Sequence, residues 1–373
     1  MIDPTLISVC AELPRPNCST DELLAAGRDH LSDGLVAMLR GIGVEKRHSV
    51  LVNYPDVLFR NAEPKADIAT TDLAVAAARK CLAKGEVAPD SIGLVLGVTS
   101  APGRLLPSLV CDVIARMPEI SRTVANLSIE YMGCSAMAKV VETARWYLSC
   151  FPDKRVLVCF TEAITPLSPV LPDFYSHFSE IRAEDRQSTV DAMHGFLFAD
   201  AAVAMVFGAE GAGPSFGQVA NLTNELPEDT ELGTVPDGGS DIPVVHGRRL
   251  YTLSSEVTPR GAFYARETVR ALLDDPSCAL TVPGDASVLL MHTGSMRILD
   301  SLCAQFGVPA DSGIVSSSYN VLRDYGNTLG CSVPLMVAEP VRRDPGQGIV
   351  VAFGLSFSCG AFTMTVPEGG WTP

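Results

Sequence analysis

The sequence predicts an α/β protein built from two similar halves. Short β-branched runs alternate with Ala-rich stretches along the 373 residues, a pattern typical of α/β folds. Sliding the chain against itself superposes LVLGVTS (94–100) on SVLLMHT (287–293) and VLVCFTE (156–162) on IVVAFGL (349–355), both with a shift of 193 residues. Two strand motifs that share one shift indicate an internal duplication.

Buried strands are predicted where short apolar, β-branched runs occur, and helices where Ala-rich stretches carry apolar residues at helical spacing. The predicted strands are 91–100, 156–162, 201–208, 286–293, 348–355 and 360–366. The predicted helices include 71–84, 135–149, 261–274 and 296–306. Residues 210–247 are rich in Gly, Pro, Asp and Glu, which is typical of surface loop. We therefore predict an N-terminal half over 1–209, a connecting region over 210–247 and a C-terminal half over 248–373.

The first half carries an insertion. FADAAVAMVFG (198–208) and FSCGAFTMTV (357–366) are alike, but the shift between them is 159 residues instead of 193. The difference indicates an extra loop of about 34 residues, at roughly 163–197. Loops of this length are usually lids or partner surfaces.

Charge and cysteine content restrict the class of protein. With 28 Lys and Arg against 43 Asp and Glu, the formal net charge is −15, which argues against binding to nucleic acid or to an anionic membrane. The N-terminus lacks the features of a signal peptide, and no apolar run is long enough to cross a bilayer. The eleven cysteines are odd in number and lie mostly in apolar runs, which is typical of free thiols. We expect a cytoplasmic protein.

The duplication also predicts where chemistry occurs. It places Thr99 and His292 at equivalent strand ends, and Cys134 and Asn327 in equivalent Gly-X turns. If the halves pack about a pseudo-twofold axis, these positions converge near the centre. A helix N-terminus favours the thiolate of a cysteine nucleophile. A neighbouring histidine would hold that thiolate as an ion pair, and histidine and asparagine would both donate hydrogen bonds to an oxyanion.

Each of these residues also has a structural interpretation. Taken singly, Cys134 is typical of a small core residue, His292 of a hydrogen-bonded core histidine and Asn327 of a turn. The shared register favours the catalytic interpretation. The sequence contains no C-x-x-C or H-E-x-x-H metal motif and no phosphate-binding glycine motif. A cysteine hydrolase and a non-catalytic synthase subunit remain alternatives.

The motifs around these residues resemble a known family. GCSA, HTGSMRILD and YGNTLGCSVPLM, in that order, are similar to the Cys-His-Asn triad of the thiolase superfamily. GVEKRHSV, LPSL, RVLVCFTE, GFLFADAAVAMVFG and AFGLSFSCGA extend the likeness over about residues 30–366. Within the superfamily, the chain resembles type III polyketide synthases and ketoacyl synthase III. The resemblance implies a duplicated five-layered αβαβα fold, a homodimer, and acyl thioesters of coenzyme A or acyl carrier protein as substrates.

The resemblance also implies an acyltransferase mechanism without a permanently bound cofactor or metal. Cys134 would take an acyl group from acyl-CoA, and malonyl-CoA would lose carbon dioxide to give an enolate that attacks the Cys134 thioester. His292 and Asn327 would stabilise the enolate oxygen. Backbone N–H groups of Cys134 and of the segment around Ser356 would form the oxyanion hole.

The two branches of the family imply different products. GVEKRH, LPSL and HTGSMRILD favour the polyketide branch and secondary metabolism, whereas YGNT, SVPL and AFGLSFSCGA favour a single condensation as in ketoacyl synthase III. Phe198 lies where polyketide synthases gate the tunnel, but it is equally typical of a core aromatic. Arg40, Lys46 and Arg47 form either a solvated basic turn or the mouth that binds coenzyme A phosphates. The acidic composition favours free coenzyme A thioesters over an acidic carrier protein.

Overall fold

A single twisted sheet runs through the molecule, seen in the computed structural model as two joined halves. The structure describes residues 1–15, 17–29, 31–169, 171, 186–235, 239–240, 243, 252–292, 294–355 and 357–373, with the backbone alone at 186–189 and 191. In this part of the chain the strand order is β11-β12-β13-β8-β1-β7-β6-β4-β5. Strands β1 and β8 meet at one pair only, Thr5 with Ser215. The sheet therefore divides into two half-sheets at this junction.

The two half-sheets repeat one pattern. In the first, β4 and β6 are parallel and β6 and β7 are antiparallel. In the second, β11 and β12 are parallel and β12 and β13 are antiparallel, so the predicted duplication is confirmed. The first half-sheet contains β1 (Thr5–Glu12), β4 (Ile92–Thr99), β5 (Ala125–Glu130), β6 (Arg155–Glu162) and β7 (Ala201–Gly208). The second contains β8 (Ser215–Thr223), β11 (Leu289–Met291), β12 (Gly346–Gly354) and β13 (Ser358–Val366).

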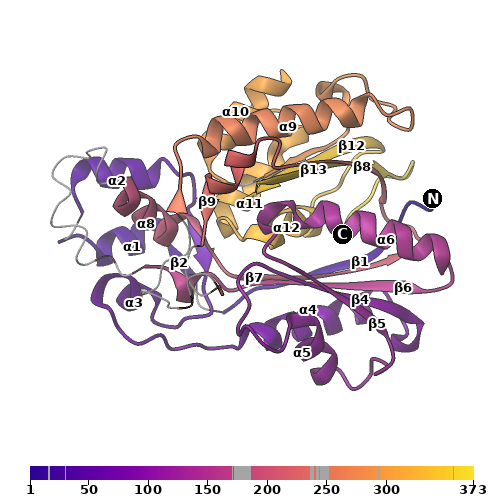
Figure 1. Cartoon of the computed structure of the whole chain (residues 1–373), viewed down its shortest axis with the longest axis horizontal. Coiled ribbons are helices and arrows are strands. Elements are labelled where there is room, and N and C mark those ends of the chain that lie inside the picture. The colour runs from indigo at the N-terminus through magenta and orange to yellow at the C-terminus, as the bar shows by residue number, and fades with distance from the viewer. Residues whose placement is uncertain are drawn as a thin grey trace.

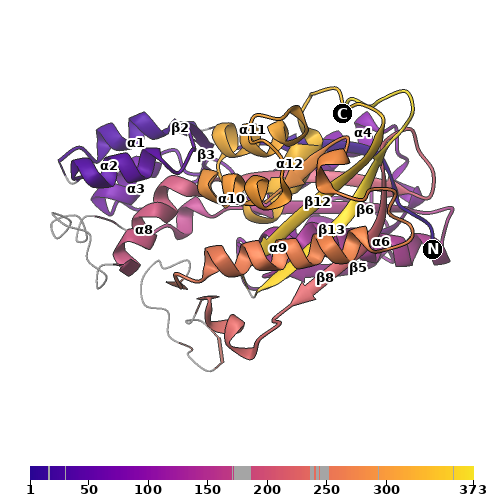
Figure 2. The same ribbon diagram turned by 90° about the horizontal axis from the view of Figure 1, so that it is seen from above.

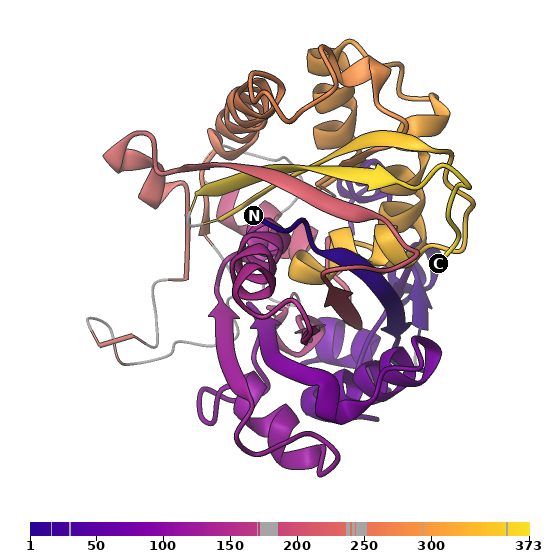
Figure 3. The ribbon, with the colours of Figure 1, turned by 90° about the vertical axis from the view of Figure 1, so that its right-hand side faces the viewer.

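Helices cover both faces of each half-sheet, which gives five layers (Figure 3). The outer layers contain α4 (Thr70–Lys84) and α5 (Leu109–Arg116) on one side and α9 (Val257–Leu273) and α10 (Met296–Phe306) on the other. Between the half-sheets lie α6 (Ala136–Cys150) and α12 (Ser332–Ala338). Because β6 after Arg155 and the whole of β7 are buried, their near-continuous Val, Ala and Phe content follows from cover on both faces.

A group of helices extends beyond the layers at one end (Figures 1 and 2). It comprises α1 (Thr20–Ala26), α2 (Asp33–Arg40), α3 (Tyr54–Arg60) and α8 (Arg186–Leu197), beside the short hairpin of β2 (Asn17–Ser19) and β3 (Lys46–His48). Its apolar residues join one large core cluster that also contains Cys134 and Phe353. The helix ends follow local signals, since Ser19 and Glu22 form a capping box at α1 and Ser32 caps α2.

Most predicted elements are present, within a few residues at their ends. The helix over 296–306 begins after the Ser295 cap and ends at Gly307, whose φ of +66° suits glycine. Two expectations were wrong or incomplete. Residues 210–247 are not only a connection, because β8 pairs with β13 inside the sheet. The proposed extra loop at 163–197 contains α8, and its residues 172–185 lie outside the described part of the chain.

The remaining short elements lie around these layers. They are α11 (Ser316–Tyr325), which precedes the Asn327 turn, and the pair β9 (Gly233–Thr234) and β10 (Thr252–Leu253). Within the described ranges, none of the helices has the length and apolar content required to span a membrane.

Candidate active site

Cys134 lies in a tight turn at the entrance to α6. Residues Gly133–Ser135 form one 3-10 turn, and α6 begins at Ala136. The turn needs glycine at 133, where φ is +54°. The Gly133 N–H donates to Ser100 Oγ at 2.8 Å, which ties the turn to the end of β4. Cys134 is therefore held between the sheet and the first turn of a buried helix, as predicted.

Asn327 of the second half meets Cys134. The Cys134 thiol contacts Asn327 Oδ1 at 3.8 Å, and the Leu329 N–H donates to the same oxygen at 2.9 Å. Two backbone hydrogen bonds hold the residue, because the Asn327 N–H donates to Leu197 O and the Asn327 carbonyl accepts from the Ala199 N–H. Asn327 Oδ1 thus already accepts a hydrogen bond from the protein. The side-chain NH2 group of Asn327 is therefore the group that can donate to a ligand.

His292 is buried beside the same region, directly after β11. The backbone N–H of His292 donates to Val351 O at 3.0 Å, and the imidazole ring lies 4.5 Å from the ring of Phe353. The next residue on β12, Gly354, packs against the backbone of Cys134. His292 is 6% exposed, and its Nδ1 has no hydrogen-bond partner among the residues that the structure describes. The structure therefore places His292 near the Cys134 turn through Phe353 and Gly354, with an uncommitted ring nitrogen.

Burial sets the protonation of both groups. It raises the pKa of the Cys134 thiol, and the Glu162 carboxylate raises it further. Burial lowers the pKa of His292 to about 3. A thiol and a neutral imidazole are therefore the resting forms at neutral pH. Desolvation therefore opposes the thiolate that the helix N-terminus and His292 were expected to favour at Cys134.

Glu162 was given no role from the sequence, yet it joins the two halves at the site. Its carboxylate accepts backbone N–H groups of Ser100 and Ala101, at the end of β4, and of Gly330, beyond Asn327. It is buried, and desolvation raises its pKa to about 8, against the lowering effect of these donors. Thr99, the counterpart of His292 in the repeat, also donates to this carboxylate. The only signal in the sequence was a lone acidic residue at the end of a buried strand.

The C-terminal segment approaches the Cys134 turn closely. A Cβ at Gly354 would lie 2.4 Å from Met132 O and 3.1 Å from Cys134 N. A Cβ at Gly133 would in turn lie 3.5 Å from Gly354 Cα and 3.7 Å from Leu355 N. The segment expected to form part of the oxyanion hole is therefore adjacent to the nucleophile turn. Ser356 itself lies outside the described residues.

Phe198 lies at the backbone of Asn327. The two residues form an isolated parallel bridge, and the Phe198 ring is 5.2 Å from that of His194. Phe198 is buried in the cluster that contains Cys134. The structure thus brings Phe198 to the site, and it is compatible with both the gating and the core interpretation.

The three basic residues predicted to bind coenzyme A, Arg40, Lys46 and Arg47, lie in different environments. Arg47 is fully buried, and its guanidinium donates to Thr20 Oγ1 at 2.7 Å and to Phe196 O at 2.9 Å. The expectation that Arg47 binds coenzyme A phosphates is wrong, because the side chain of Arg47 points from β3 into the protein core. Lys46 is exposed on the same strand. Arg40 is exposed and pairs with Asp21 at 2.8 Å.

Arg40 lines a surface pocket of about 260 Å³. Arg323 of α11 contributes a second guanidinium to it, and Glu45 and Met296 lie in the same wall. Met296 begins the helix that follows His292. Groups of His, Cys, Asp or Glu suitable for a metal ion are absent from the described part of the chain.

Part of the chain matches a known family, and most of it is similar in sequence to known synthases. Residues 279–366 match the family described as 3-Oxoacyl-[acyl-carrier-protein (ACP)] synthase III C terminal. The chain is 26% identical over 304 residues to a beta-ketoacyl-[acyl-carrier-protein] synthase III of Oleidesulfovibrio alaskensis, covering 78% of this chain and 83% of the relative. It is 28% identical over 301 residues to the synthase of the same name from Nitratidesulfovibrio vulgaris, covering 78% and 81%.

Solved structures show the same fold. The type III polyketide synthase domain of Steely1 from Dictyostelium superposes with a TM-score of 0.78 at 20% identity, covering 97% of this chain and 99% of that one. The 3-oxoacyl-(acyl carrier protein) synthase III FabH from Pseudomonas aeruginosa gives 0.72 at 20% identity, with 98% of each chain covered. CsyB in complex with CoA-SH gives 0.78 at 17% identity, covering 98% and 100%.

Proposed function

We propose that the chain is a thiolase-superfamily condensing enzyme, like the ketoacyl synthase III and type III polyketide synthases that it resembles, and that it condenses an acyl-CoA starter with malonyl-CoA. The observation that carries the proposal is the contact of Cys134 with Asn327 across the two halves, beside buried His292. A nucleophile and two donors that meet in a desolvated site suit covalent acyl transfer followed by carbon–carbon bond formation.

In the first step, the Cys134 thiol attacks the thioester carbonyl of the starter. The thiol proton passes to the departing coenzyme A thiolate, so the step consumes no external base. The carbonyl oxygen becomes an oxyanion, which the Cys134 N–H and the N–H groups of the segment after Gly354 would stabilise. The high pKa of Cys134 couples thiolate formation to the arrival of substrate.

In the second step, decarboxylation of malonyl-CoA supplies the carbanion. The bond to the carboxyl carbon breaks, carbon dioxide leaves, and the electron pair forms an enolate whose oxygen accepts hydrogen bonds from Asn327 Nδ2 and from His292. The carbanion attacks the Cys134 thioester carbonyl, the carbon–sulfur bond breaks, and Cys134 leaves as a thiolate that takes a proton from water. Decarboxylation makes a strong base unnecessary, which agrees with a histidine whose pKa is about 3.

The phosphates of coenzyme A are proposed to bind at the pocket of Arg40 and Arg323. Two guanidinium groups in one pocket suit a polyanionic nucleotide in a chain whose net charge is −15. Both arginines are now paired with single aspartates, Asp21 and Asp324. Exchange of these exposed ion pairs for phosphates requires little energy.

A single condensation on a thioester of coenzyme A or acyl carrier protein is the second candidate. The family match over 279–366 and the relatives named as synthase III favour it. The fold neighbours of the polyketide class favour repeated extension instead. A non-catalytic subunit is the least favoured alternative, because the three predicted catalytic residues are all present.

The experiment is acylation and turnover with malonyl-CoA and a panel of acyl-CoA starters. We expect a mass shift on the Cys134 peptide, carbon dioxide release and a condensed product. Cys134→Ala should abolish acylation, while Cys159→Ala, which removes a buried thiol of β6, serves as the matched control. Condensation by Cys134→Ala would overturn the proposal, and free acid without a carbon–carbon product would identify a hydrolase. The chain length of the product separates the two condensing candidates.

We also propose a homodimer in a reducing compartment. All eleven cysteines are free thiols, which suits the cytoplasm.

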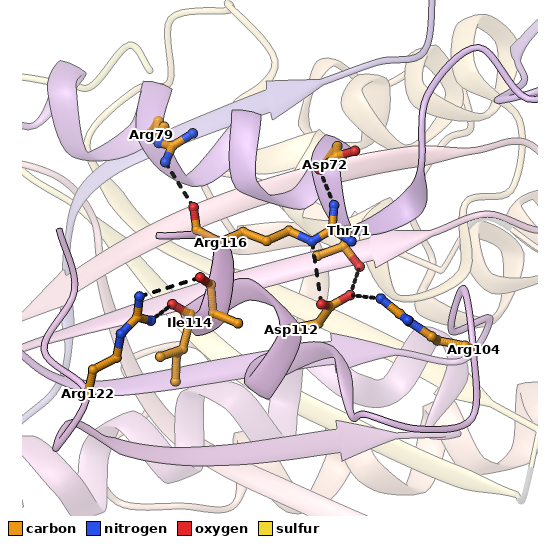
Figure 4. A network of polar contacts seen from close by, with 9 residues as sticks. Thr71, Asp72, Arg79, Arg104, Asp112, Ile114, Arg116 and Arg122 are labelled. Atoms are coloured by element: carbon orange, nitrogen blue, oxygen red, sulfur yellow. Dashed lines mark hydrogen bonds and ion pairs between the residues drawn. The ribbon is translucent and has the colours of Figure 1, made fainter. Parts of the chain in front are cut away.

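Strand β5 forms one edge of the sheet, and the adjacent loop 100–108 exposes Leu105 and Leu106. Figure 4 shows how that loop is fixed: Arg104 donates to Asp112 of α5, which also accepts from Thr71.

A further inference from the structure

The last turn of α4 lies across β1 in a regular series of contacts, remote in sequence from the candidate active site. Lys80 pairs with Glu12, the Ser8 hydroxyl lies 3.2 Å from Cys81 Sγ, and Lys84 Nζ donates to Val9 O at 3.3 Å. Ser8 and Glu12 flank Cys10 at alternate positions of the strand. Strand alternation therefore turns Cys10 toward α4.

Cys10 and Cys81 consequently meet. Each thiol has the largest effect on the pKa of the other, and Cys10 packs against the apolar cluster that contains Cys81. Ser8 holds Cys81 in place, because its hydroxyl also donates to the Cys81 carbonyl at 2.9 Å. Cys81 is buried, whereas Cys10 is partly exposed. One thiol of the pair is thus accessible to a reagent and the other is positioned behind it.

The surroundings favour ionisation of the accessible thiol. The Cys81 thiol lowers the pKa of Cys10 to about 7, and Lys84 and Lys80 also lower it. The Cys10 thiol, together with burial, raises the pKa of Cys81. A thiolate next to a protonated thiol is the arrangement that redox-sensing cysteine pairs require.

We propose that Cys10 and Cys81 are a redox-sensitive dithiol that a peroxide converts to an intramolecular disulfide. The Cys10 thiolate attacks the peroxide oxygen, the O–O bond breaks, and hydroxide leaves as Cys10 becomes a sulfenic acid. The Cys81 sulfur then attacks the Cys10 sulfur, the S–O bond breaks, and the hydroxyl group leaves as water with the Cys81 proton. Peroxide is reduced by two electrons and the two thiols are oxidised by two. The disulfide would link β1 covalently to α4.

The test uses the whole protein, treated with hydrogen peroxide, blocked with N-ethylmaleimide and cleaved without reduction. Cleavage after Glu12 and Lys80 separates Cys10 from Cys18 and releases a peptide that begins at Cys81. We expect the first disulfide to join Cys10 and Cys81, with loss of two hydrogens. A Cys81–Cys159 disulfide, or a Cys10 sulfinic acid beside a reduced Cys81, would overturn the proposal.

Two further measurements keep the proposal testable if a variant is unstable. In the unmodified chain at pH 7, iodoacetamide should alkylate Cys10 about tenfold faster than the exposed thiols of Cys111 and Cys150, because more of Cys10 is thiolate. Lys84→Gln should slow that alkylation severalfold. In Cys81→Ser, Cys10 should stop at a sulfenic acid that dimedone traps. Equal alkylation rates for Cys10, Cys111 and Cys150 would contradict the dithiol.

Discussion

At the scale of single residues, position 354 has room only for a hydrogen atom in place of a side chain. The Cβ of Gly354→Ala would lie 2.4 Å from Met132 O, a backbone atom that moves only with the whole Cys134 turn. We expect this variant to lose about 1–3 kcal/mol of unfolding free energy and nearly all condensing activity. Denaturant titration and product formation measure the two effects. Gly313→Ala, where a Cβ meets nothing within 4 Å, should change neither; equal losses in both variants would disprove the steric argument.

Glu162 makes a prediction about pH. Its folded-state pKa of about 8 lies above its ordinary value of 4.5, so the folded chain holds a proton that the unfolded chain has released between these limits. Stability should therefore fall as pH rises from about 5 to 8, by up to about 1.4 kcal/mol per pH unit from this group. Glu162→Gln cannot titrate, so its unfolding free energy should depend less steeply on pH in this window.

The Glu162→Gln variant also has a cost that does not depend on pH. The glutamine amide must turn its NH2 group toward at least one of the backbone donors at Ser100, Ala101 and Gly330, which leaves a buried N–H unsatisfied. We expect a loss of about 1–3 kcal/mol at low pH. Chemical denaturation at pH 5 and pH 8 separates the two effects. Parallel pH profiles for the two proteins would show that Glu162 does not titrate in this range.

The sequence located part of this site and missed the rest for a physical reason. Cys134 and Asn327 could be found because one shift relates them, and the fold brings them to 3.8 Å. Glu162 and Gly354 could not be found in that way. Their importance comes from the approach of segments far apart in the chain, and neither a buried carboxylate nor a steric limit leaves a local pattern.

At the scale of elements, Arg47 joins the β2–β3 hairpin to α1 and α8. Its guanidinium reaches Thr20 of α1 and Phe196 of α8. Arg47→Ala would remove these charge-assisted hydrogen bonds and leave buried acceptors unpaired, so we expect a loss of about 3 kcal/mol of unfolding free energy. Exposed Lys46→Ala on the same strand should change stability by less than about 0.5 kcal/mol.

Thermal unfolding and substrate kinetics together test these roles. Arg40→Ala should leave the melting temperature unchanged and raise KM for acyl-CoA, whereas Arg47→Ala should lower the melting temperature. A lower melting temperature for Arg40→Ala, or a raised KM with an unchanged melting temperature for Arg47→Ala, would contradict the proposed phosphate pocket and the structural role of Arg47.

The elements that were predicted correctly are those with strong local periodicity. The strands around 156–160 and 201–208 are apolar because both of their faces are covered. Strand β8 was taken as loop, since SFGQVANLT contains glycine and polar residues on its less buried face. Arg47 was taken as a surface residue because charge runs are usually solvated, and only the pairing of β3 with β2 turns it inward.

At the scale of the whole molecule, one edge of the sheet is open within the described part of the chain. Strand β5 pairs with β4 on one side only, within the described part of the chain. Leu127 in the middle of β5 is 46% exposed, and Leu106 in the loop after β4 is 82% exposed. The Tyr131 N–H donates to Thr99 O at 3.0 Å, which keeps the end of β5 beside the start of that loop. An open edge with apolar side chains favours strand pairing between chains.

We therefore expect a homodimer with twice the 39.6 kDa chain mass, joined along β5. Leu127→Lys would bury a charge between the paired edges, so sedimentation velocity should show a concentration-dependent shift toward the monomer. The matched control is Val282→Lys, which charges an exposed valine far along the chain from this edge and should leave the dimer intact. If Leu127→Lys sediments as a dimer at every concentration tested, the copies associate through another surface. Because the loop with Leu106 starts at Thr99, beside the Glu162 carboxylate, monomers should also condense substrates more slowly than the dimer.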